Sequence, residues 1–289
     1  MNRIAIGTAQ FGLPYGIANQ TGKIAQSEAK EILKIALDNN IDVLDTAIIY
    51  GDSESSLGKL QTEDFNLVTK LPIIPKNCKD IGVWIREQVS QSFSRLGVQD
   101  IYGLLLHQSN QLLGSYGADL YREMRLLKEL GKVKKIGISI YSPLELDALD
   151  NKYDFDIVQS PFNLLDQRLY TSGWLMRLKD KGIEVHTRSV FLQGLLLMDQ
   201  DKIPSKFSKW DELWCKWHKW LKDFDGKATE ACLSLPLSFP EIDKVIVGID
   251  NTSQLIEILN SIKNPNVQGM PDLQCTNENL INPSNWPYL

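Results

Sequence analysis

The sequence is poor in the residues that build disulfide frameworks and metal centres. Its 289 residues include three histidines and only four cysteines, which are scattered without a C-x-x-C pair (Cys78, Cys215, Cys232 and Cys275). Zinc ligands usually come in closely spaced Cys and His pairs, so this distribution argues against a zinc site. We therefore expect free thiols and no bound metal.

Long hydrophobic runs and an excess of basic charge are also missing. No stretch approaches the roughly 18 apolar residues of a membrane-spanning helix, and the opening M-N-R-I-A-I-G has no signal-peptide pattern. A net charge of −5 does not favour nucleic acid as a partner. The tightest basic cluster (Lys132, Lys134 and Lys135) is interpreted as a solvated turn. These features predict a cytoplasmic protein with small-molecule partners, no nucleic acid and no membrane.

Several short catalytic motifs are absent as well. The chain has no G-x-S-x-G, no G-x-x-x-x-G-K-[ST] and no H-E-x-x-H. The G-x-G-x-x-G turn of an open, doubly wound dinucleotide-binding sheet is also missing, since G-T-A-Q-F-G at residues 7–12 has a different spacing.

Strand-like apolar runs alternate with helix-period segments along the chain. Strands are expected at residues 3–8, 41–45, 65–70, 101–107, 135–140, 156–160, 183–189 and 244–249. Helices are expected near residues 27–39 (capped by Ser27), 53–60, 81–96, 118–130, 171–181 and 252–262, with a short one after Pro143. Eight β-α units of this kind close into a barrel. We predict an α/β fold, a single-domain (β/α)8 TIM barrel over residues 1–262. A C-terminal tail follows over residues 263–289, and its ending N-P-S-N-W-P-Y-L looks too polar and proline-rich for a further helix.

Ionisable residues stand at the carboxyl ends of three consecutive expected strands. Asp45, Lys70 and His107 end the second, third and fourth strands, and Tyr50 follows Asp45 in the next loop. The carboxyl ends of parallel barrel strands share one rim, where catalytic residues gather. We therefore predict that these four side chains meet there.

The four side chains are suited to proton transfer to a carbonyl oxygen. The Lys70 ammonium would lower the pKa of the Tyr50 phenol, and Asp45 would keep Lys70 charged. His107 would donate a hydrogen bond to the carbonyl oxygen. Since no side chain supplies a hydride, carbonyl reduction would require a nicotinamide cofactor. Taken singly, each residue could equally be a loop cap, a surface group or a core histidine.

The order of the motifs resembles the aldo-keto reductase family. The matching segments are I-G-T-A-Q-F-G, D-T-A-I-I-Y-G, V-T-K-L-P, L-L-L-H, K-K-I-G-I-S, D-I-V-Q-S-P-F-N, R-S-V-F-L-Q-G-L-L and V-I-V-G-I-D-N-T-S-Q-L. The resemblance implies an NAD(P)H-dependent TIM-barrel oxidoreductase that reduces an aldehyde or ketone, or runs the reverse reaction. Asp45, Tyr50, Lys70 and His107 would be its catalytic residues, with Tyr50 as the general acid.

The resemblance also implies a set of cofactor-binding residues. Ser139 and Gln159 would hydrogen-bond the nicotinamide carboxamide, and backbone amides from Gly248 to Thr252 would hold phosphate at the start of the last helix. The full set is Gly7, Thr8, Ser139, Gln159, Arg188, Ser189, Phe191, Gln193, Leu195, Gly248, Asp250 and Thr252.

Three positions depart from the family pattern. Ile140 follows Ser139 where the family commonly has Asn, and Arg188 stands where many members place a ring on the nicotinamide. Asp250 stands where members that prefer NADP usually present Lys or Arg. An acidic side chain would repel a 2′-phosphate and could accept a bond from a free ribose hydroxyl. We therefore favour NADH or dual use over strict NADPH.

Long rim loops would supply the substrate pocket. The predicted substrate-binding residues are Gln10, Phe11, Tyr15, Gln108, Asn163, Arg168 and Trp286. This polar set suits a sugar-like or other polar carbonyl compound. The tryptophan-rich segment 207–224 is interpreted as a helix on the barrel wall with His218 exposed, and a ring-stacking platform is the alternative.

Other functions could use the same features. A non-catalytic NAD(P)-binding module could report redox state to a partner, and an isomerase or epimerase could retain its cofactor. The presence of all four ionisable residues favours an enzyme, which we expect to be a monomer or a weak homo-oligomer.

Overall fold

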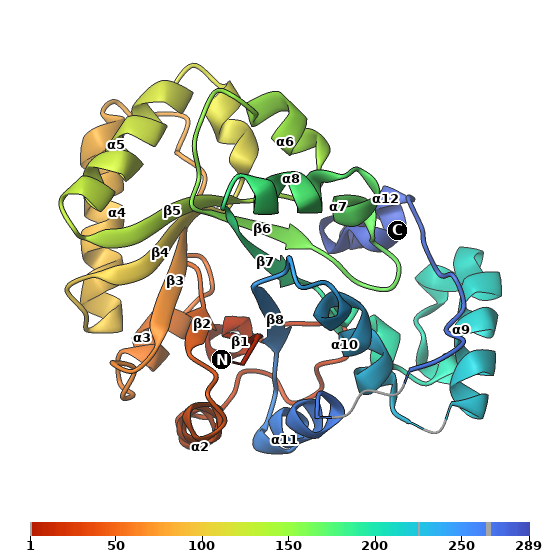
Figure 1. Cartoon of the computed structure of the whole chain (residues 1–289). Coiled ribbons are helices and arrows are strands. Elements are labelled where there is room, and N and C mark those ends of the chain that lie inside the picture. The colour runs from red at the N-terminus through yellow and green to blue at the C-terminus, as the bar shows by residue number, and fades with distance from the viewer. Residues whose placement is uncertain (1, 225, 264–266) are drawn as a thin grey trace.

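The computed structural model describes residues 2–224, 226–263 and 267–289. In this part of the chain, eight parallel strands close into a barrel in chain order (Figure 1). The strands are β1 (Ile4–Gly7), β2 (Val43–Asp45), β3 (Asn66–Leu71), β4 (Ile101–Leu106), β5 (Val133–Ser139), β6 (Ile157–Pro161), β7 (Glu184–Arg188) and β8 (Lys244–Gly248). The predicted (β/α)8 barrel is confirmed. Residue 1, and residues 264–266 of the predicted tail, lie outside the described residues.

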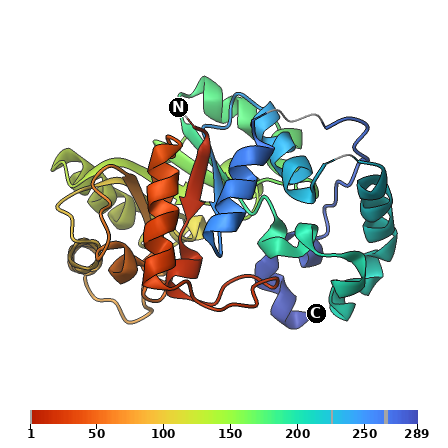
Figure 2. The ribbon, with the colours of Figure 1, turned by 90° about the horizontal axis from the view of Figure 1, so that it is seen from below.

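Helices surround the strands (Figures 1 and 2). The α-helices are α1 (Ala9–Gly12), α2 (Gln26–Asp38), α3 (Ser53–Leu57), α4 (Ile81–Leu96), α5 (Gly117–Glu129), α6 (Leu144–Leu149), α7 (Arg168–Thr171), α8 (Trp174–Asp180), α9 (Asp211–Asp223), α10 (Ala228–Ser238), α11 (Thr252–Ser261) and α12 (Glu278–Ile281). Short 3₁₀ segments are η1 (Ser109–Leu113), η2 (Leu192–Leu197), η3 (Gln200–Lys202), η4 (Ser205–Trp210) and η5 (Pro283–Tyr288). Across the described ranges, none of the helices has both the length and the apolar character needed to cross a bilayer.

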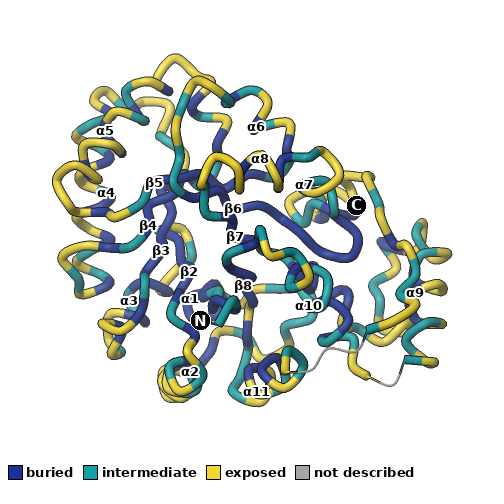
Figure 3. The backbone as a smooth tube through the Cα atoms, in the orientation of Figure 1, coloured by how far each residue is buried: buried dark blue, intermediate teal, exposed yellow. Residues whose placement is uncertain are grey.

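An apolar layer fills the barrel beneath its carboxyl rim. It consists of inward-facing side chains from six strands: Ala5, Val43, Val68, Leu105, Ile157 and Ile246. Figure 3 shows the strands buried and the outer faces of the helices exposed. Because every member of the layer is at most 7% exposed, polar groups on the rim above it have no water below them.

A polar cluster closes the opposite end of the barrel. The Glu184 carboxylate accepts a hydrogen bond from the Tyr102 phenol (2.8 Å), lies 2.7 Å from Nε2 of His186 and forms an ion pair with Lys135. The predicted solvated turn is therefore wrong for Lys135, which lies on β5 and reaches into this cluster.

Some helix boundaries differ from those predicted from the sequence. Helix α2 begins at Gln26 after Ala25, so Ser27 lies within its first turn and does not cap it. The helix predicted over residues 171–181 begins later, as α8 at Trp174, because Gly173 adopts a left-handed conformation (φ 78°) and separates it from α7, which ends at Thr171. Helix α10 was not predicted.

The C-terminal tail folds back and is anchored by its tryptophan. The expectation that the ending N-P-S-N-W-P-Y-L forms no further helix is wrong, since the 3₁₀ segment η5 lies there, directly after α12. Trp286 packs edge-on against Phe207 with ring centroids 5.0 Å apart, and its indole donates to the Leu280 carbonyl (3.0 Å). Lys206 donates to the Trp286 carbonyl (3.0 Å), which ties the tail to the loop after β7.

Helix α9 carries the predicted tryptophan stripe at the periphery of the molecule (Figures 1 and 2). The indoles of Trp214 and Trp217 are buried and donate to the carbonyls of Phe207 and Leu196. Both acceptors lie in the loop after β7, so the helix packs on that loop and its buried rings are not a ligand platform. His218 is buried as well, at 8% exposure, contrary to the prediction.

Candidate active site

A cavity of about 830 Å³ opens at the carboxyl rim of the barrel. Its volume falls within the range of cofactor and ligand sites. The predicted site residues that line it are Gly7, Thr8, Gln10, Tyr15, Asp45, Tyr50, His107, Ser139, Gln159, Arg188, Ser189, Phe191, Gln193, Gly248 and Asp250. The structure thus brings most of the predicted residues to one place.

Lys70 and Asp45 form a buried ion pair beside the cavity. Nζ of Lys70 lies 2.6 Å from Oδ2 of Asp45 and also donates to the Thr46 carbonyl (2.9 Å). The two side chains are 1% and 5% exposed. Burial lowers the pKa of Lys70, and the Asp45 carboxylate opposes that shift. The carboxylate therefore offsets part of the cost of burying the ammonium, as the sequence suggested.

Gln159 holds the second oxygen of Asp45. Its Nε2 donates to Oδ1 of Asp45 at 2.7 Å, which fixes the carboxylate between an amide and an ammonium. The other end of the amide, Oε1, is buried and has no hydrogen-bond partner within the described ranges. An unsatisfied buried acceptor is costly. A ligand that brings an N–H donor to this point would satisfy it.

Tyr50 and His107 meet above the ion pair. Their rings are edge to face, with centroids 5.8 Å apart, and Nζ of Lys70 lies 5.3 Å from the Tyr50 ring centroid. Burial, followed by the charge of Asp45, raises the pKa of Tyr50 well above its usual value. The expected net lowering of this pKa is therefore wrong, because burial and the Asp45 charge outweigh any stabilisation of the phenolate by the Lys70 ammonium, which is paired with Asp45. At neutral pH the phenol is a proton donor.

His107 is neutral in this setting. Burial is the main reason that its pKa falls to about 3, and the charges of Lys70 and Arg188 add to the effect. A neutral imidazole donates from one nitrogen only. Nδ1 is buried with no partner among the described residues, which leaves the ring without a fixing bond until a ligand arrives.

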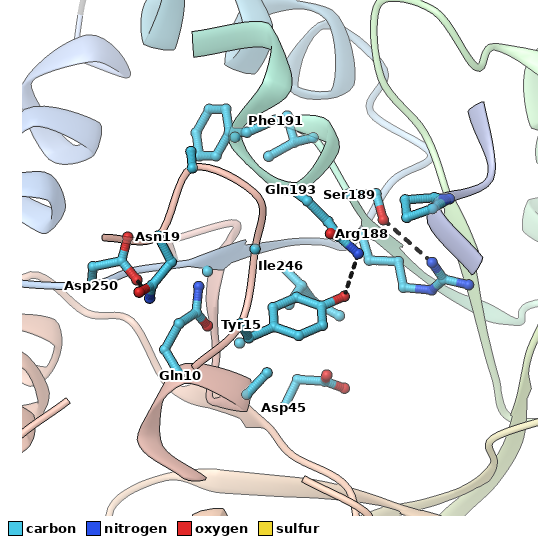
Figure 4. A pocket seen from close by; sticks show the side chains of 18 of the residues that line it. Gln10, Tyr15, Asn19, Asp45, Arg188, Ser189, Phe191, Gln193, Ile246 and Asp250 are labelled. Carbon is cyan, nitrogen blue, oxygen red and sulfur yellow. Dashed lines mark hydrogen bonds between the residues drawn. The ribbon is translucent and has the colours of Figure 1, made fainter. Parts of the chain in front are cut away.

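The loop after β7 has a strained backbone where it borders the cavity. Ser189, Leu192 and Gln193 have φ values of 62°, 48° and 54°, in the left-handed region that disfavours side chains other than glycine. Strain of this kind is concentrated at ligand sites, where the surrounding structure holds it. The Gln193 amide donates to the Tyr15 hydroxyl (3.3 Å), so the loop after β1 meets the loop after β7 over the cavity (Figure 4).

Acidic side chains surround the far end of the cavity, near α11. Asp250 accepts a hydrogen bond from Asn19 (2.8 Å, Figure 4). The Thr252 amide, which the sequence assigned to a phosphate, donates instead to Glu28 (2.6 Å), and Thr252 does not line the cavity. A carboxylate therefore already occupies the anion-binding end of this helix.

Two predicted substrate residues hold the backbone together instead of facing the cavity. The Asn163 side chain accepts from the amides of Leu165 and Asp166 and donates to the Ser189 carbonyl (3.0 Å). Arg168 forms ion pairs with Asp166 and with Glu278 of the tail. These partners satisfy both side chains, so neither is left to bind a substrate.

The remaining predicted site residues also lie outside the lining. Phe11 and Leu195 are 1% exposed within the hydrophobic core. Trp286 anchors the tail, which lines the cavity through Pro283 and Ser284 instead. Gln108 starts the loop after β4 and does not reach the cavity.

Several lining residues were missed from the sequence. They include Leu13, Asn19, Ile49, Tyr141, Val190, Lys227, Thr229, Gln254, Glu257, Ile258, Pro283 and Ser284. Tyr141, two residues after Ser139 at the end of β5, carried a positional signal that could have found it. Lys227 and Thr229 lie at the start of α10, and Pro283 begins η5; neither element was predicted.

The barrel and the cluster of Tyr50, Lys70, Asp45 and His107 define a (β/α)8 protein with its site at the carboxyl rim. Residues 3–269 match the model of the aldo/keto reductase family. The chain belongs to this family of oxidoreductases, and the resemblance seen in the sequence is confirmed. Members of the family use NAD(P)H in general.

Two curated relatives show the extent of the sequence similarity. The chain is 28% identical over 224 residues to oxidoreductase sirO of Leptosphaeria maculans, covering 72% of this chain and 65% of that protein. It is 27% identical over 206 residues to aldo-keto reductase YhdN of Bacillus subtilis (strain 168), covering 68% and 60%. The chain thus spans less than two thirds of the length of these relatives.

Solved structures share the fold. The holo form of an aldo-keto reductase from Bacillus halodurans matches with a TM-score of 0.71 at 19% identity, covering 92% of this chain and 88% of that one. The glycerol dehydrogenase of Gluconobacter oxydans matches with a TM-score of 0.70 at 21% identity and the same coverage. At such identities the likeness establishes the barrel and no particular substrate.

Proposed function

We propose that this chain catalyses the NAD(P)H-dependent reduction of an aldehyde or ketone to an alcohol, or the reverse reaction. The observation that carries the proposal is the placement of Tyr50 at the cavity, against His107 and above the Lys70–Asp45 ion pair. These groups can deliver a proton and stabilise the charge left behind. A sugar-like or other polar carbonyl compound is the proposed substrate.

The cavity suits a nicotinamide cofactor. Gln159 offers a buried oxygen without a donor, and Ser139 lies beside it on the cavity wall, so together they suit the amide of a nicotinamide. When bound, the cofactor supplies the hydride that no side chain can supply. The other proposed cofactor contacts are Gly7, Thr8, Ser189, Phe191, Gln193 and Gly248.

Tyr50 acts as the general acid in the reductive direction. Its raised pKa keeps the phenol protonated at neutral pH, so it can donate a proton as negative charge develops on the carbonyl oxygen. The Lys70 ammonium then stabilises the phenolate. In the oxidative direction the phenolate would accept the proton, but the high pKa makes that species scarce.

His107 positions the carbonyl. With its pKa lowered to about 3, the ring stays neutral throughout the neutral pH range and can donate one hydrogen bond to the carbonyl oxygen. Its ring is perpendicular to that of Tyr50, with centroids 5.8 Å apart, so the two donors are close enough to serve one oxygen.

We propose that NADH is used at least as well as NADPH. Asp250 and Glu257 line the end of the cavity near α11, and Glu28 accepts the Thr252 amide there. Lys227, the cation at this end, is paired with Glu257 at 2.8 Å. A 2′-phosphate bound there would be repelled by these carboxylates, since the nearby cation is already paired.

The decisive experiment is a cofactor-dependent carbonyl reduction screen with Tyr50→Phe as the test variant. We expect kcat to fall by about 10²–10⁴-fold, the usual contribution of a positioned general acid, while cofactor affinity is retained. Tyr116→Phe, at an exposed position away from the cavity, is the matched control.

Undiminished turnover by Tyr50→Phe would remove the phenol from the mechanism. Tight cofactor binding by the wild type without any turnover would favour the redox-sensing alternative. A cytoplasmic location and a monomeric or weakly associating state stay predictions from the sequence.

A further inference from the structure

Arg188 presents a guanidinium to the cavity without a counter-charge. It is the last residue of β7, and its Cζ lies 4.7 Å from the centroid of the Tyr141 ring. One terminal nitrogen donates to the Ile140 carbonyl (2.9 Å) and the other to the Ser189 hydroxyl (3.3 Å, Figure 4). A ring, a carbonyl and a hydroxyl hold the group in place, but none of them neutralises it.

The other cations near the cavity are neutralised. Lys70 is paired with Asp45 at 2.6 Å, and Lys227 with Glu257 at 2.8 Å. His107 is uncharged at neutral pH because its pKa is about 3. Of the described side chains that line the cavity, Arg188 is therefore the cation that no carboxylate pairs with.

Arg188 also acts close to the reacting groups. Its charge lowers the pKa of His107 and works against the rise in the pKa of Tyr50. The guanidinium lines the cavity together with Tyr50 and His107, and in Figure 4 it lies on the opposite side of Tyr15 from Asp250, at the other end of the cavity. An anion bound there would belong to the molecule whose carbonyl meets Tyr50.

The geometry favours an anion over a stacked nicotinamide. One face of the guanidinium is turned to Tyr141, and an oxidised nicotinamide beside a free guanidinium would place two positive charges together. A guanidinium has five N–H donors, and the two hydrogen bonds to Ser189 and Ile140 leave some of them unused. The unused donors suit carboxylate or phosphate oxygens.

We propose that Arg188 binds an anionic group of the substrate, so that the enzyme acts on carbonyl compounds bearing a carboxylate or a phosphate. This inference rests on the proposed carbonyl reduction and narrows its substrate class. Binding the anion also neutralises the guanidinium beside the site where the cofactor becomes cationic during reduction.

The first test compares matched substrates. We expect kcat/KM for 4-carboxybenzaldehyde to exceed kcat/KM for its methyl ester, and kcat/KM for glyceraldehyde 3-phosphate to exceed that for glyceraldehyde. Added salt should reduce both preferences. In Arg188→Gln the preference for the charged substrate over its uncharged partner should fall about ten- to a hundredfold, the range expected for a lost charge-assisted hydrogen bond. Any effect of the lost charge on Tyr50 and His107 is common to both substrates and cancels in this ratio. Arg188→Lys, which keeps the charge but loses the fork, should lie between.

Lys227→Gln is the control variant. It removes a positive charge from the same cavity, but one already paired with Glu257, so the ratio between charged and uncharged substrates should stay as in the wild type. A ratio that shifts equally in both variants would show a general field effect and overturn the proposal.

A binding measurement separates this inference from the proposed function. Titration calorimetry of the cofactor-free protein should show benzoate binding that Arg188→Gln weakens by about tenfold or more, with benzyl alcohol unaffected.

Arg188-dependent benzoate binding in a protein that reduces no carbonyl would support the anion site and refute the reductase. Active enzyme that treats acid and ester alike would refute the anion site. A rise confined to the KM of the cofactor in Arg188→Gln would assign the guanidinium to a cofactor phosphate and overturn the inference.

Discussion

Tyr50 enters catalysis as a protonated phenol because burial and the charge of Asp45 both oppose its ionisation. Lys70 lies 5.3 Å from the ring centroid, yet its own charge is balanced by the carboxylate at 2.6 Å. The ammonium favours the phenolate over the phenol, but its pairing with Asp45 weakens that effect, and burial and the Asp45 charge keep the pKa of Tyr50 raised.

Asp250 offers a test of cofactor choice by a single substitution. We expect Asp250→Arg to lower the KM for NADPH by about tenfold or more, since one charge-assisted hydrogen bond contributes 1.5–3 kcal/mol. The KM for NADH should rise or stay unchanged. Steady-state kinetics with both cofactors measures the ratio, and Asp201→Arg, on the exposed segment η3, controls for added charge.

In the wild type we expect the KM for NADH to be equal to or lower than the KM for NADPH. A hundredfold preference for NADPH would contradict the proposal, because it would require a cationic partner for the 2′-phosphate.

Among the elements, η5 at the end of the tail has one buried side chain. Trp286 is 3% exposed and joins η5 to Phe207, while Tyr288 in the same segment is 87% exposed. Truncating a buried aromatic residue costs about 3–5 kcal/mol, more than the few hydrogen bonds of so short a segment can offset. We expect Trp286→Ala to detach η5 at the end of the tail and to speed its limited proteolysis by about tenfold or more.

Tyr288→Ala is the matched control and should leave proteolysis unchanged. Loss of the tail also removes Pro283 and Ser284 from the cavity, so KM for the carbonyl substrate should change more than KM for the cofactor. Equal proteolysis of the two variants would show that the tail is held by other contacts.

The sequence predicted the elements whose pattern is local and missed those that depend on distant contacts. Asp45, Lys70 and His107 could be placed on one rim because each directly follows an apolar strand. Helix α10 was missed because it is buried on several sides and contains Pro236, so it shows neither a polar face nor a clear period. The pairing of Arg168 with Glu278, 110 residues apart, leaves no local signal, so Arg168 was assigned to the substrate.

On the scale of the whole molecule, the barrel is polar at both ends and apolar between them. The layer around Val68 and Leu105 separates the rim, with its Lys70–Asp45 pair, from the cluster around Glu184. The rim groups serve chemistry at the cavity. The cluster around Glu184 lies outside the cavity lining and satisfies polar groups where the barrel would otherwise admit water.

The Glu184 cluster should make the stability of the whole fold depend on acid pH. Hydrogen bonds and charges from His186, Lys135 and Tyr102 outweigh the effect of burial and lower the pKa of Glu184 from 4.5 to about 2. Because the folded pKa lies below the unfolded one, the stabilisation is complete above about pH 4.5 and is lost as the pH falls toward 2. We expect Glu184→Gln to reduce the free energy of unfolding by about 2 kcal/mol at pH 7.

Urea unfolding at a series of pH values measures this difference. The difference in the free energy of unfolding between wild type and Glu184→Gln should be constant from pH 7 to about pH 5 and then narrow as acid is added. Protonation of Glu184 removes the same negative charge from the wild type that the substitution has already removed from the variant. Glu129→Gln, on the exposed face of α5, should show no gap at any pH. A gap that stays constant below pH 4 would mean that Glu184 stabilises the barrel by its packing and not by its charge.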